Sequence, residues 1–312
     1  MPVTFDECFQ TFPAINPPRD FAGFWKSALE SLRRVPVDPR QRMVIKRTLV
    51  REQITEVRFK SIGRYELRGQ LHVPRKRGRV PGVISFHDYQ DNRILDTDKA
   101  IGDAGLAHLR MDLRGHEAIV PGMPFTPVKD AKLDPPSSSY PYLAVLDALR
   151  AVDYLRIHES IDPNKIAVIG RGFGGSLAAF AAALYPDKIH AMSLERPSFL
   201  YLTRWLGEST SVLAQEVREI LGPSRGKTKA RKALDFLDCL YFAPALKQPA
   251  FFTVGLADDK SSPACAFALF NHLQSDKTMD LYPDEEKDPL GTGQRKKSAE
   301  FLSSVFESNN AG

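Results

Sequence analysis

The sequence predicts an α/β fold with a mostly parallel central sheet and helices on both faces. Short apolar runs, typical of buried strands, alternate with amphipathic segments of helical length along most of the 312 residues. One stretch, 165–185, reads K-I-A-V-I-G-R-G-F-G-G-S-L-A-A-F-A-A-A-L-Y and predicts a strand, a glycine-dense turn and a helix in direct succession. The sequence contains neither an internal repeat nor a linker, so residues 1–312 are expected to form one domain.

The elements expected before the parallel sheet are a helix and a hairpin. Aromatic and aliphatic residues recur at helical spacing in 20–33, and Asp20 is placed to cap this helix. Residues 53–60 and 65–73 alternate apolar and polar side chains on either side of Ser61-Ile-Gly-Arg64. This alternation predicts a β-hairpin.

The parallel sheet is expected to begin near Val80. Its strands are predicted at 83–86, 106–113, 166–169, 189–194, 251–254 and 279–282. Helices are predicted at 142–155, after the glycine turn up to Pro186, at 263–273 and at the end of the chain to about Glu307. The segment 197–246 is mostly helical in pattern, and we expect it to form a cap inserted between two strands.

Composition and charge exclude several classes of protein. A net charge of +5, from 43 Lys and Arg against 38 Asp and Glu, falls short of the basic footprint of a dedicated nucleic-acid binder. The N-terminal sequence does not resemble a secretory signal, and no apolar run is long enough to span a membrane. Cys8, Cys239 and Cys265 are scattered and odd in number, which argues against a disulfide framework or a thiolate metal site. We expect a cytoplasmic protein without a cofactor.

Six motifs in order resemble one known family. They are Phe21-x-x-Phe-Trp25, Phe86-His-Asp-Tyr89, Asp112-Leu-Arg-Gly-His116, Glu195-Arg-Pro-Ser-Phe199, Val254-Gly-Leu-Ala-Asp258 and Leu281-Tyr-Pro283. They are similar to the leading helix and to the H-G-Y, D-x-R-G-Q, D-V-P-F, V-G-L-x-D and Y-P motifs of the acetyl xylan esterase and cephalosporin C deacetylase family. The resemblance covers nearly the whole chain and implies an α/β-hydrolase fold. It also implies oligomers, because the family commonly forms hexamers built from dimers.

The resemblance implies a Ser-His-Asp triad, and this chain departs from it at two of three positions. The G-G-S-Q-G-G turn of the family corresponds to Gly170-Arg-Gly-Phe-Gly-Gly175, which puts Gly172 at the nucleophile position. Asp258 keeps the acid position, and Lys287 stands at the histidine position, with no histidine after His272. Acyl transfer by a triad needs a hydroxyl and a neutral imidazole, and neither glycine nor a charged lysine supplies them. We therefore expect no intact catalytic set.

Other parts of the family's site are expected to remain. By resemblance, the oxyanion-hole donors are the backbone N–H groups of Tyr89 and Phe173, which do not depend on side-chain identity. Glycine also relieves the strain of the turn at position 172. His87, Arg114 and His116 follow strand ends and are candidates to line the pocket.

Other residues of the chain are alternative candidates for chemistry. Ser176 is in a loose G-x-S-x-A pattern, but it falls one helical turn beyond Gly172 and is expected to bond within its helix. Cys265, near a helix N-terminus, is expected to be a buried small side chain rather than a reactive thiol. Asp258 and Lys287 are expected to form an ion pair. The acidic run 284–288 is expected to be a solvated turn rather than a metal site.

These observations give three hypotheses for function. The first is a non-catalytic relative of the acetyl esterases with a binding, scaffold or regulatory role, whose partner is another protein, a second copy or a small ligand in the remaining pocket. The second is a deacetylase for small acetylated carbohydrates that uses an unrecognised nucleophile. The third is a docking module in which the basic run 225–232 binds an acidic partner. Gly172→Ser with Lys287→His is expected to restore some esterase activity if the pocket is open.

Overall fold

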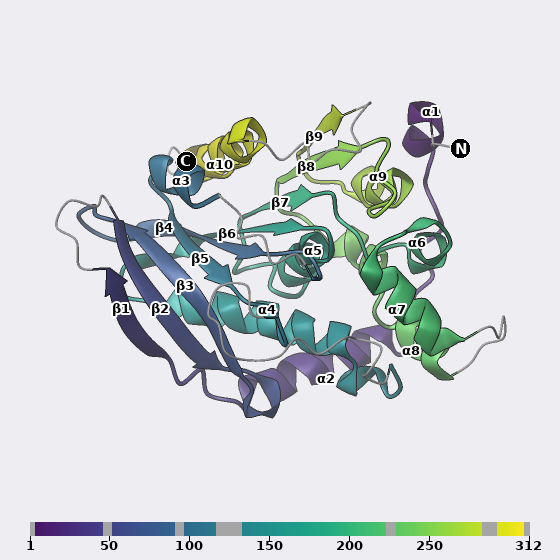
Figure 1. The fold of residues 1–312 in the computed structure, drawn as a ribbon, viewed down its shortest axis with the longest axis horizontal. Helices are drawn as coiled ribbons and strands as arrows, with labels where there is room; N and C mark the ends of the chain where they lie inside the picture. Colours follow the sequence, from purple (N-terminus) through teal and green to yellow (C-terminus); the bar gives the residue numbers. More distant parts are fainter. Residues whose placement is uncertain are drawn as a thin grey trace.

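A single twisted sheet forms the centre of the computed structural model, with helices packed against both of its faces (Figure 1). The structure describes residues 4–45, 52–90, 97–116, 133–222, 229–282 and 292–308. Within these ranges the chain forms a mixed α/β architecture, as the alternating pattern predicts.

The sheet has nine described strands in the order β1-β2-β3-β5-β4-β6-β7-β8-β9. Their bounds are β1 Arg40–Ile45, β2 Glu52–Lys60, β3 Glu66–Pro74, β4 Val80–Phe86, β5 Ala107–Met111, β6 Ile161–Arg171, β7 Ala191–Glu195, β8 Ala250–Gly255 and β9 Lys277–Tyr282. β1, β2 and β3 pair antiparallel and join the sheet through an antiparallel β3–β5 contact. From β5 to β9 every pairing is parallel, so the carboxyl ends of these strands meet at one edge.

Helices fill most of the connections between strands. The α-helices are α1 Phe5–Phe9, α2 Phe21–Arg33, α3 Thr97–Asp103, α4 Tyr140–Ile157, α5 Phe173–Leu184, α6 Leu202–Glu208, α7 Val212–Leu221, α8 Lys229–Asp235, α9 Pro263–His272 and α10 Thr292–Ser308. Short 3₁₀ turns are η1 Ile62–Arg64, η3 Pro136–Ser138 and η4 Cys239–Ala245. In the described part of the segment between β7 and β8, α6, α7, α8 and η4 are helical, which is the region expected to form the cap.

Two hydrophobic cores lie on opposite faces of the sheet. Along β6, Ile166 and Val168 join the larger core, whereas Ala167 and Ile169 join the smaller one. Successive side chains of a strand point to opposite faces, so this alternation shows that β6 is buried on both sides. The smaller core is closed by α3 and α10, which lie together in Figure 1, and the larger one includes α2, α4, α5 and α9.

The sequence located most of these elements, and the differences have local causes. The predicted strand 106–113 is shorter, because only Ala107–Met111 pairs with its neighbours. The predicted strand 166–169 extends over Ile161–Arg171, because Val80 pairs with Ile161. The prediction that Asp20 caps its helix is wrong, since its side chain makes no capping hydrogen bond with α2.

None of the described helices is long and apolar enough to cross a membrane.

Candidate functional site

The site begins with the turn between β6 and α5, where Gly172 has φ +54° and ψ −121°. This left-handed conformation strains any residue with a side chain, and glycine adopts it with little cost. The N–H of Gly172 donates to the carbonyl of Glu195 at 2.9 Å, and its carbonyl accepts from Gly175 and Ser198, each at 3.0 Å. The sharp turn is therefore held at both of its ends by backbone hydrogen bonds.

Close packing explains a second glycine in this turn. Gly174 lies against the carbonyl oxygens of Phe86 and His87 at the end of β4, and a Cβ there would collide with both. The first turn of α5 consequently rests on the backbone that follows β4. This contact brings the N–H of Phe173 beside the turn 86–90.

The carboxylate of Asp88 occupies the centre of the site. Its Oδ1 accepts hydrogen bonds from the N–H groups of Tyr89 and Phe173, each at 2.8 Å. These are the two groups expected to form the oxyanion hole, and the structure brings them onto one oxygen. A Cβ built at Gly172 would overlap the carboxyl group of Asp88, touching Cγ and both oxygens. Asp88 thus fills the space that a nucleophile's side chain would take.

Asp258, at the acid position, is paired with a residue that the sequence did not predict as its partner. Asp258 is buried, and its Oδ2 accepts from Nε of Arg196. Its Oδ1 accepts from the N–H groups of Lys260 at 2.9 Å and Ser261 at 3.0 Å. The described cation at Asp258 is therefore Arg196. Lys287, the partner expected from sequence, lies outside the described residues.

His87 holds two turns together rather than facing an open pocket. Its Nε2 accepts from the N–H of Leu113 at 3.0 Å, so its Nδ1 carries the proton and donates to the carbonyl of Asp88 at 2.7 Å. The ring is neutral in this arrangement. His87 fixes the backbone of Asp88, whose side chain accepts from the N–H groups of Tyr89 and Phe173.

His116 has a similar bonding role. Nε2 of His116 accepts from the N–H of Gln90 at 3.1 Å, and Nδ1 lies 3.2 Å from both the carbonyl of Arg114 and the hydroxyl of Tyr140. Burial, together with repulsion from His87 and opposed by the hydrogen bond to Arg114, lowers the pKa of His116 to about 3. The ring is therefore neutral at pH 7.

Arg114 is engaged by a buried acid. Its Nε and Nη2 donate to the two carboxylate oxygens of Asp147, each at 2.8 Å, and its guanidinium lies 4.3 Å from the ring centre of Tyr65. Asp147 is fully buried. Arg114 is thus committed to a bidentate ion pair that anchors the turn after β5 to α4.

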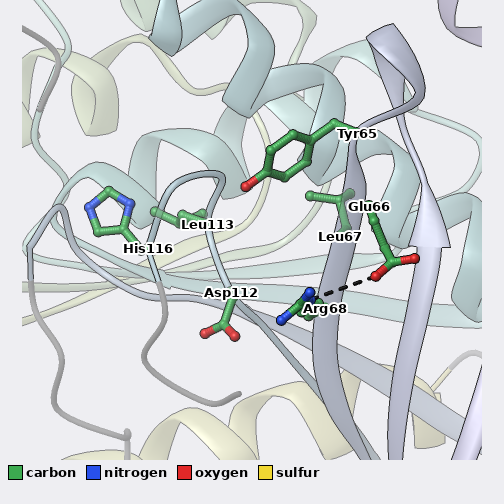
Figure 2. Close-up of a pocket in the computed structure, with 7 residues that line it drawn as sticks. All are labelled: Tyr65, Glu66, Leu67, Arg68, Asp112, Leu113 and His116. Carbon is green, nitrogen blue, oxygen red and sulfur yellow. Dashed lines mark ion pairs between the residues drawn. The ribbon is translucent and has the colours of Figure 1, made fainter. Parts of the chain in front are cut away.

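A small cavity lies beside this turn (Figure 2). Its seven lining residues come from the start of β3 and from the turn after β5: Tyr65, Glu66, Leu67, Arg68, Asp112, Leu113 and His116. Its volume of about 10 Å³ is close to the minimum for one water molecule. Of the three pocket candidates, His116 borders this cavity, whereas His87 and Arg114 do not.

The alternative nucleophiles are buried in the scaffold. Ser176 is fully buried in α5, and its hydroxyl donates to the carbonyl of Ser198. Cys265 is buried, and this burial raises the pKa of its thiol to about 12. Neither side chain offers an exposed, activated nucleophile.

Metal ligands do not gather in the described part of the chain. No group of three or more His, Cys, Asp or Glu side chains there is arranged to hold a metal ion. The acidic run 284–288 and residues 225–228 of the basic run lie outside the described residues, whereas 229–232 lie in α8, so the roles of both runs stay predictions from sequence.

Two site residues, Asp88 and Arg196, were missed at the sequence level. Each interrupts a motif at a position that was visible: Asp88 replaces the glycine of H-G-Y, and Arg196 replaces the valine of D-V-P-F. A charged residue in place of a small or apolar one was the available signal. Their partners, Phe173 and Asp258, lie 85 and 62 residues away in sequence.

A family profile and a curated relative both relate this chain to acetyl esterases. The sequence profile described as acetyl xylan esterase (AXE1) matches residues 3–305. The acetyl esterase Axe7A of Xylanibacter ruminicola is 23% identical over 288 residues, which cover 88% of this chain and 64% of that protein. The α/β-hydrolase domain-containing protein WAV2 of Arabidopsis thaliana is 31% identical over 124 residues, 38% of each chain. The chain thus spans less than two thirds of the length of these two curated relatives.

Solved structures agree on the fold. Acetyl xylan esterase 1 from Thermoanaerobacterium sp. JW/SL YS485 superposes with a TM-score of 0.84 at 21% identity, covering 98% of this chain and all of that one. Acetyl xylan esterase from Paenibacillus sp. R4 superposes with a TM-score of 0.86 at 22% identity, covering 97% and 99%. At these identities the likeness establishes the α/β-hydrolase fold.

Proposed function

This chain belongs to the acetyl xylan esterase family, and from that premise we propose that it is a member that binds rather than hydrolyses. The observation that carries the proposal is the Asp88 carboxylate, which takes both oxyanion-hole donors and fills the side-chain space at Gly172. Acyl transfer needs the space at Gly172 for the nucleophile and the two N–H donors for the carbonyl oxygen of the substrate. Among the described residues the site therefore has no hydroxyl at the nucleophile position, and the place of the carbonyl oxygen is taken by Asp88.

The residue paired with Asp258 also supports this proposal, because it cannot act as the base of a triad. A triad base must accept the proton of the nucleophile, which a neutral imidazole does. The guanidinium of Arg196, which meets Asp258 in the described structure, stays protonated at all relevant pH values and has no acceptor. Asp258 then serves as the anchor of an ion pair and of a turn rather than as the orienting acid of a histidine.

Surviving hydrolysis through another nucleophile has less support. Ser176 is buried in α5, and its hydroxyl is already bonded to Ser198. His116, the departure from the family motif, uses both ring nitrogens in bonds to neighbouring groups. The geometry also changes the design of a revertant. Gly172→Ser with Lys287→His leaves Asp88 in the way, so Asp88→Gly is needed as well.

Turnover of p-nitrophenyl acetate tests the proposal. We expect the wild-type protein to release p-nitrophenol no faster than buffer containing an unrelated protein at the same concentration. Asp258→Asn is compared with Asp259→Asn, because Asp259 is the exposed neighbour of the buried acid. Saturable turnover that disappears in Asp258→Asn and persists in Asp259→Asn would show that the protein is an active esterase and would contradict the proposal.

A further inference from the structure

A strongly basic turn connects β3 to β4. Its sequence is Arg75-Lys-Arg-Gly-Arg79, so four of its five residues carry a positive charge, and all five are exposed. Within the part of the chain that the structure describes, the side chains of Lys76, Arg77 and Arg79 form neither an ion pair nor a hydrogen bond. Like charges this close together repel one another, and an anion that binds among them relieves the repulsion.

The turn borders a groove with a volume of about 420 Å³. Clefts that bind small molecules have volumes of about 300–1,000 Å³. Three cationic side chains of the turn line the groove, those of Arg75, Lys76 and Arg77, together with the amide of Gln53 and the hydroxyl of Ser160. No described carboxylate is among the lining residues. The groove therefore presents hydrogen-bond donors and positive charge to one small volume.

Backbone hydrogen bonds hold the turn on both sides. The N–H of Lys76 donates to the carbonyl of Pro74 at 2.9 Å, and the N–H of Val80 donates to the carbonyl of Ser160 at 2.9 Å. Between them, Gly78 has φ +80°, a left-handed conformation that glycine adopts with little strain. The bond to Ser160 fixes the end of the turn beside the segment that leads into β6. The groove is thus framed by backbone that is already ordered, which lowers the entropic cost of binding.

The groove lies at the opposite end of the parallel strands from Gly172. The basic turn precedes β4 and Ser160 precedes β6, so the groove is at the amino ends of these two parallel strands. Gly172 follows the carboxyl end of β6, which has 11 residues and is therefore about 35 Å long. The groove is separate from the site at Gly172, and whether the chain hydrolyses esters does not affect the inference drawn from it.

We propose that this basic groove, formed by the turn 75–79 with Gln53 and Ser160, binds a small molecule that carries a phosphate group. A phosphate monoester carries about −1.5 to −2 charge at pH 7 and offers three strong acceptor oxygens. The guanidinium of Arg77 matches two of these oxygens with parallel hydrogen bonds, and Lys76 adds a compact point charge. The neutral donors of Gln53 and Ser160 are placed to bind the remaining oxygens or the rest of the ligand.

The size of the groove and the charge of the chain favour a small ligand over a nucleic acid. The volume of about 420 Å³ accommodates one small molecule. A net charge of +5 falls short of the basic footprint that nucleic-acid binding requires. The positive charge is concentrated at one turn instead of being spread along a surface, as the contacts to a polymer of phosphates demand.

Isothermal titration calorimetry with inorganic pyrophosphate tests the groove, at constant ionic strength maintained with chloride. We expect the wild-type protein to bind pyrophosphate saturably. The double variant Lys76→Gln/Arg77→Gln should raise the Kd at least about tenfold, because two charge-assisted donors are lost. Arg33→Gln/Arg34→Gln is the matched control. It removes the same charge from two exposed residues at the end of α2, and screening by salt should keep its Kd within about twofold of wild type.

Two results of the titration would overturn the inference. One is an absence of saturable binding by the wild type. The other is an equal rise of the Kd in both double variants, which would mean that overall charge and not the groove attracts the anion. Tighter binding of single-stranded RNA or of phosphatidic acid vesicles than of pyrophosphate, lost in Lys76→Gln/Arg77→Gln, would assign the turn to a polymer or a membrane and overturn the small-molecule proposal.

Limited digestion with trypsin gives a second test that needs no variant. Trypsin cleaves after Lys and Arg, and an exposed turn is a preferred place for such cleavage. Pyrophosphate should slow the cleavage of the wild-type chain after Lys76 and Arg77, whereas cleavage after Arg34 in the same digest serves as the internal control. An equal effect of pyrophosphate on the two regions would contradict a site at the turn.

Discussion

The turn between β6 and α5 at Gly172, which we call the elbow, and the polar network beside it lie at the same edge of the sheet. They differ in whether backbone or side-chain atoms make the important bonds. At the elbow the backbone supplies the turn and the donors, and the side chain is absent. In the polar network, which we define as His87, His116, Tyr140 and the pair Arg114–Asp147, side chains make the bonds. The shape of this site and the groups at its centre are therefore set by different residues. The network holds the backbone in place, and the elbow keeps its shape with a glycine at its centre.

The largest effect on stability is expected in the network. Asp147→Ala leaves Arg114 buried without its bidentate partner, and breaking a buried pair in this way costs about 3–5 kcal/mol. Urea unfolding measures the change. Lys99→Ala is the control, because it also removes one partner of an ion pair, with Asp103, but both of these side chains are largely exposed, and its unfolding midpoint should stay unchanged. Similar midpoints for the two variants would mean that the network does not hold the scaffold.

A more specific effect, a coupling between two positions, is expected at the elbow. Gly172→Ser introduces about 1–3 kcal/mol of backbone strain and a collision with Asp88 that adds about 1–3 kcal/mol. Asp88→Ala removes the collision but not the strain. A double-mutant cycle should therefore show that the two changes together cost less than their sum, by about 0.5–3 kcal/mol. Additive free energies of unfolding would show that Asp88 and position 172 do not share one space.

An effect confined to acid pH is expected in the pH dependence of stability. The folded pKa of His116 is about 3, whereas an unfolded histidine titrates near 6.5. Below pH 6.5 the unfolded chain binds a proton that the folded chain does not, so this contribution to stability is complete above pH 6.5 and is lost progressively towards pH 3. His116→Gln removes the titrating group and keeps an acceptor for the N–H of Gln90. The free energy of unfolding of this variant should fall less steeply than that of wild type between pH 6.5 and the acid limit. Parallel curves for the two proteins would contradict a neutral, buried His116.

The sequence predicted the backbone of this site better than its occupants, for a physical reason. The family resemblance places Gly172, Tyr89 and Phe173 in a strand–turn–helix pattern and in a short motif, both of which are local in sequence. The bond from Phe173 to Asp88 and the pair of Arg196 with Asp258 join distant segments, and no periodicity reports such contacts. Asp20 failed as a cap because a capping side chain must also have the right backbone geometry, which residue type alone does not specify.

The most direct test of the central claim is the intact mass of the wild-type protein after incubation with p-nitrophenyl acetate. Asp88 fills the place of the acyl group and no hydroxyl stands at Gly172. We therefore expect no gain in mass from an acetyl group that peptide mapping places beside Gly172. An acetyl adduct that maps to a side chain beside Gly172, and that is lost in Asp258→Asn, would contradict the account.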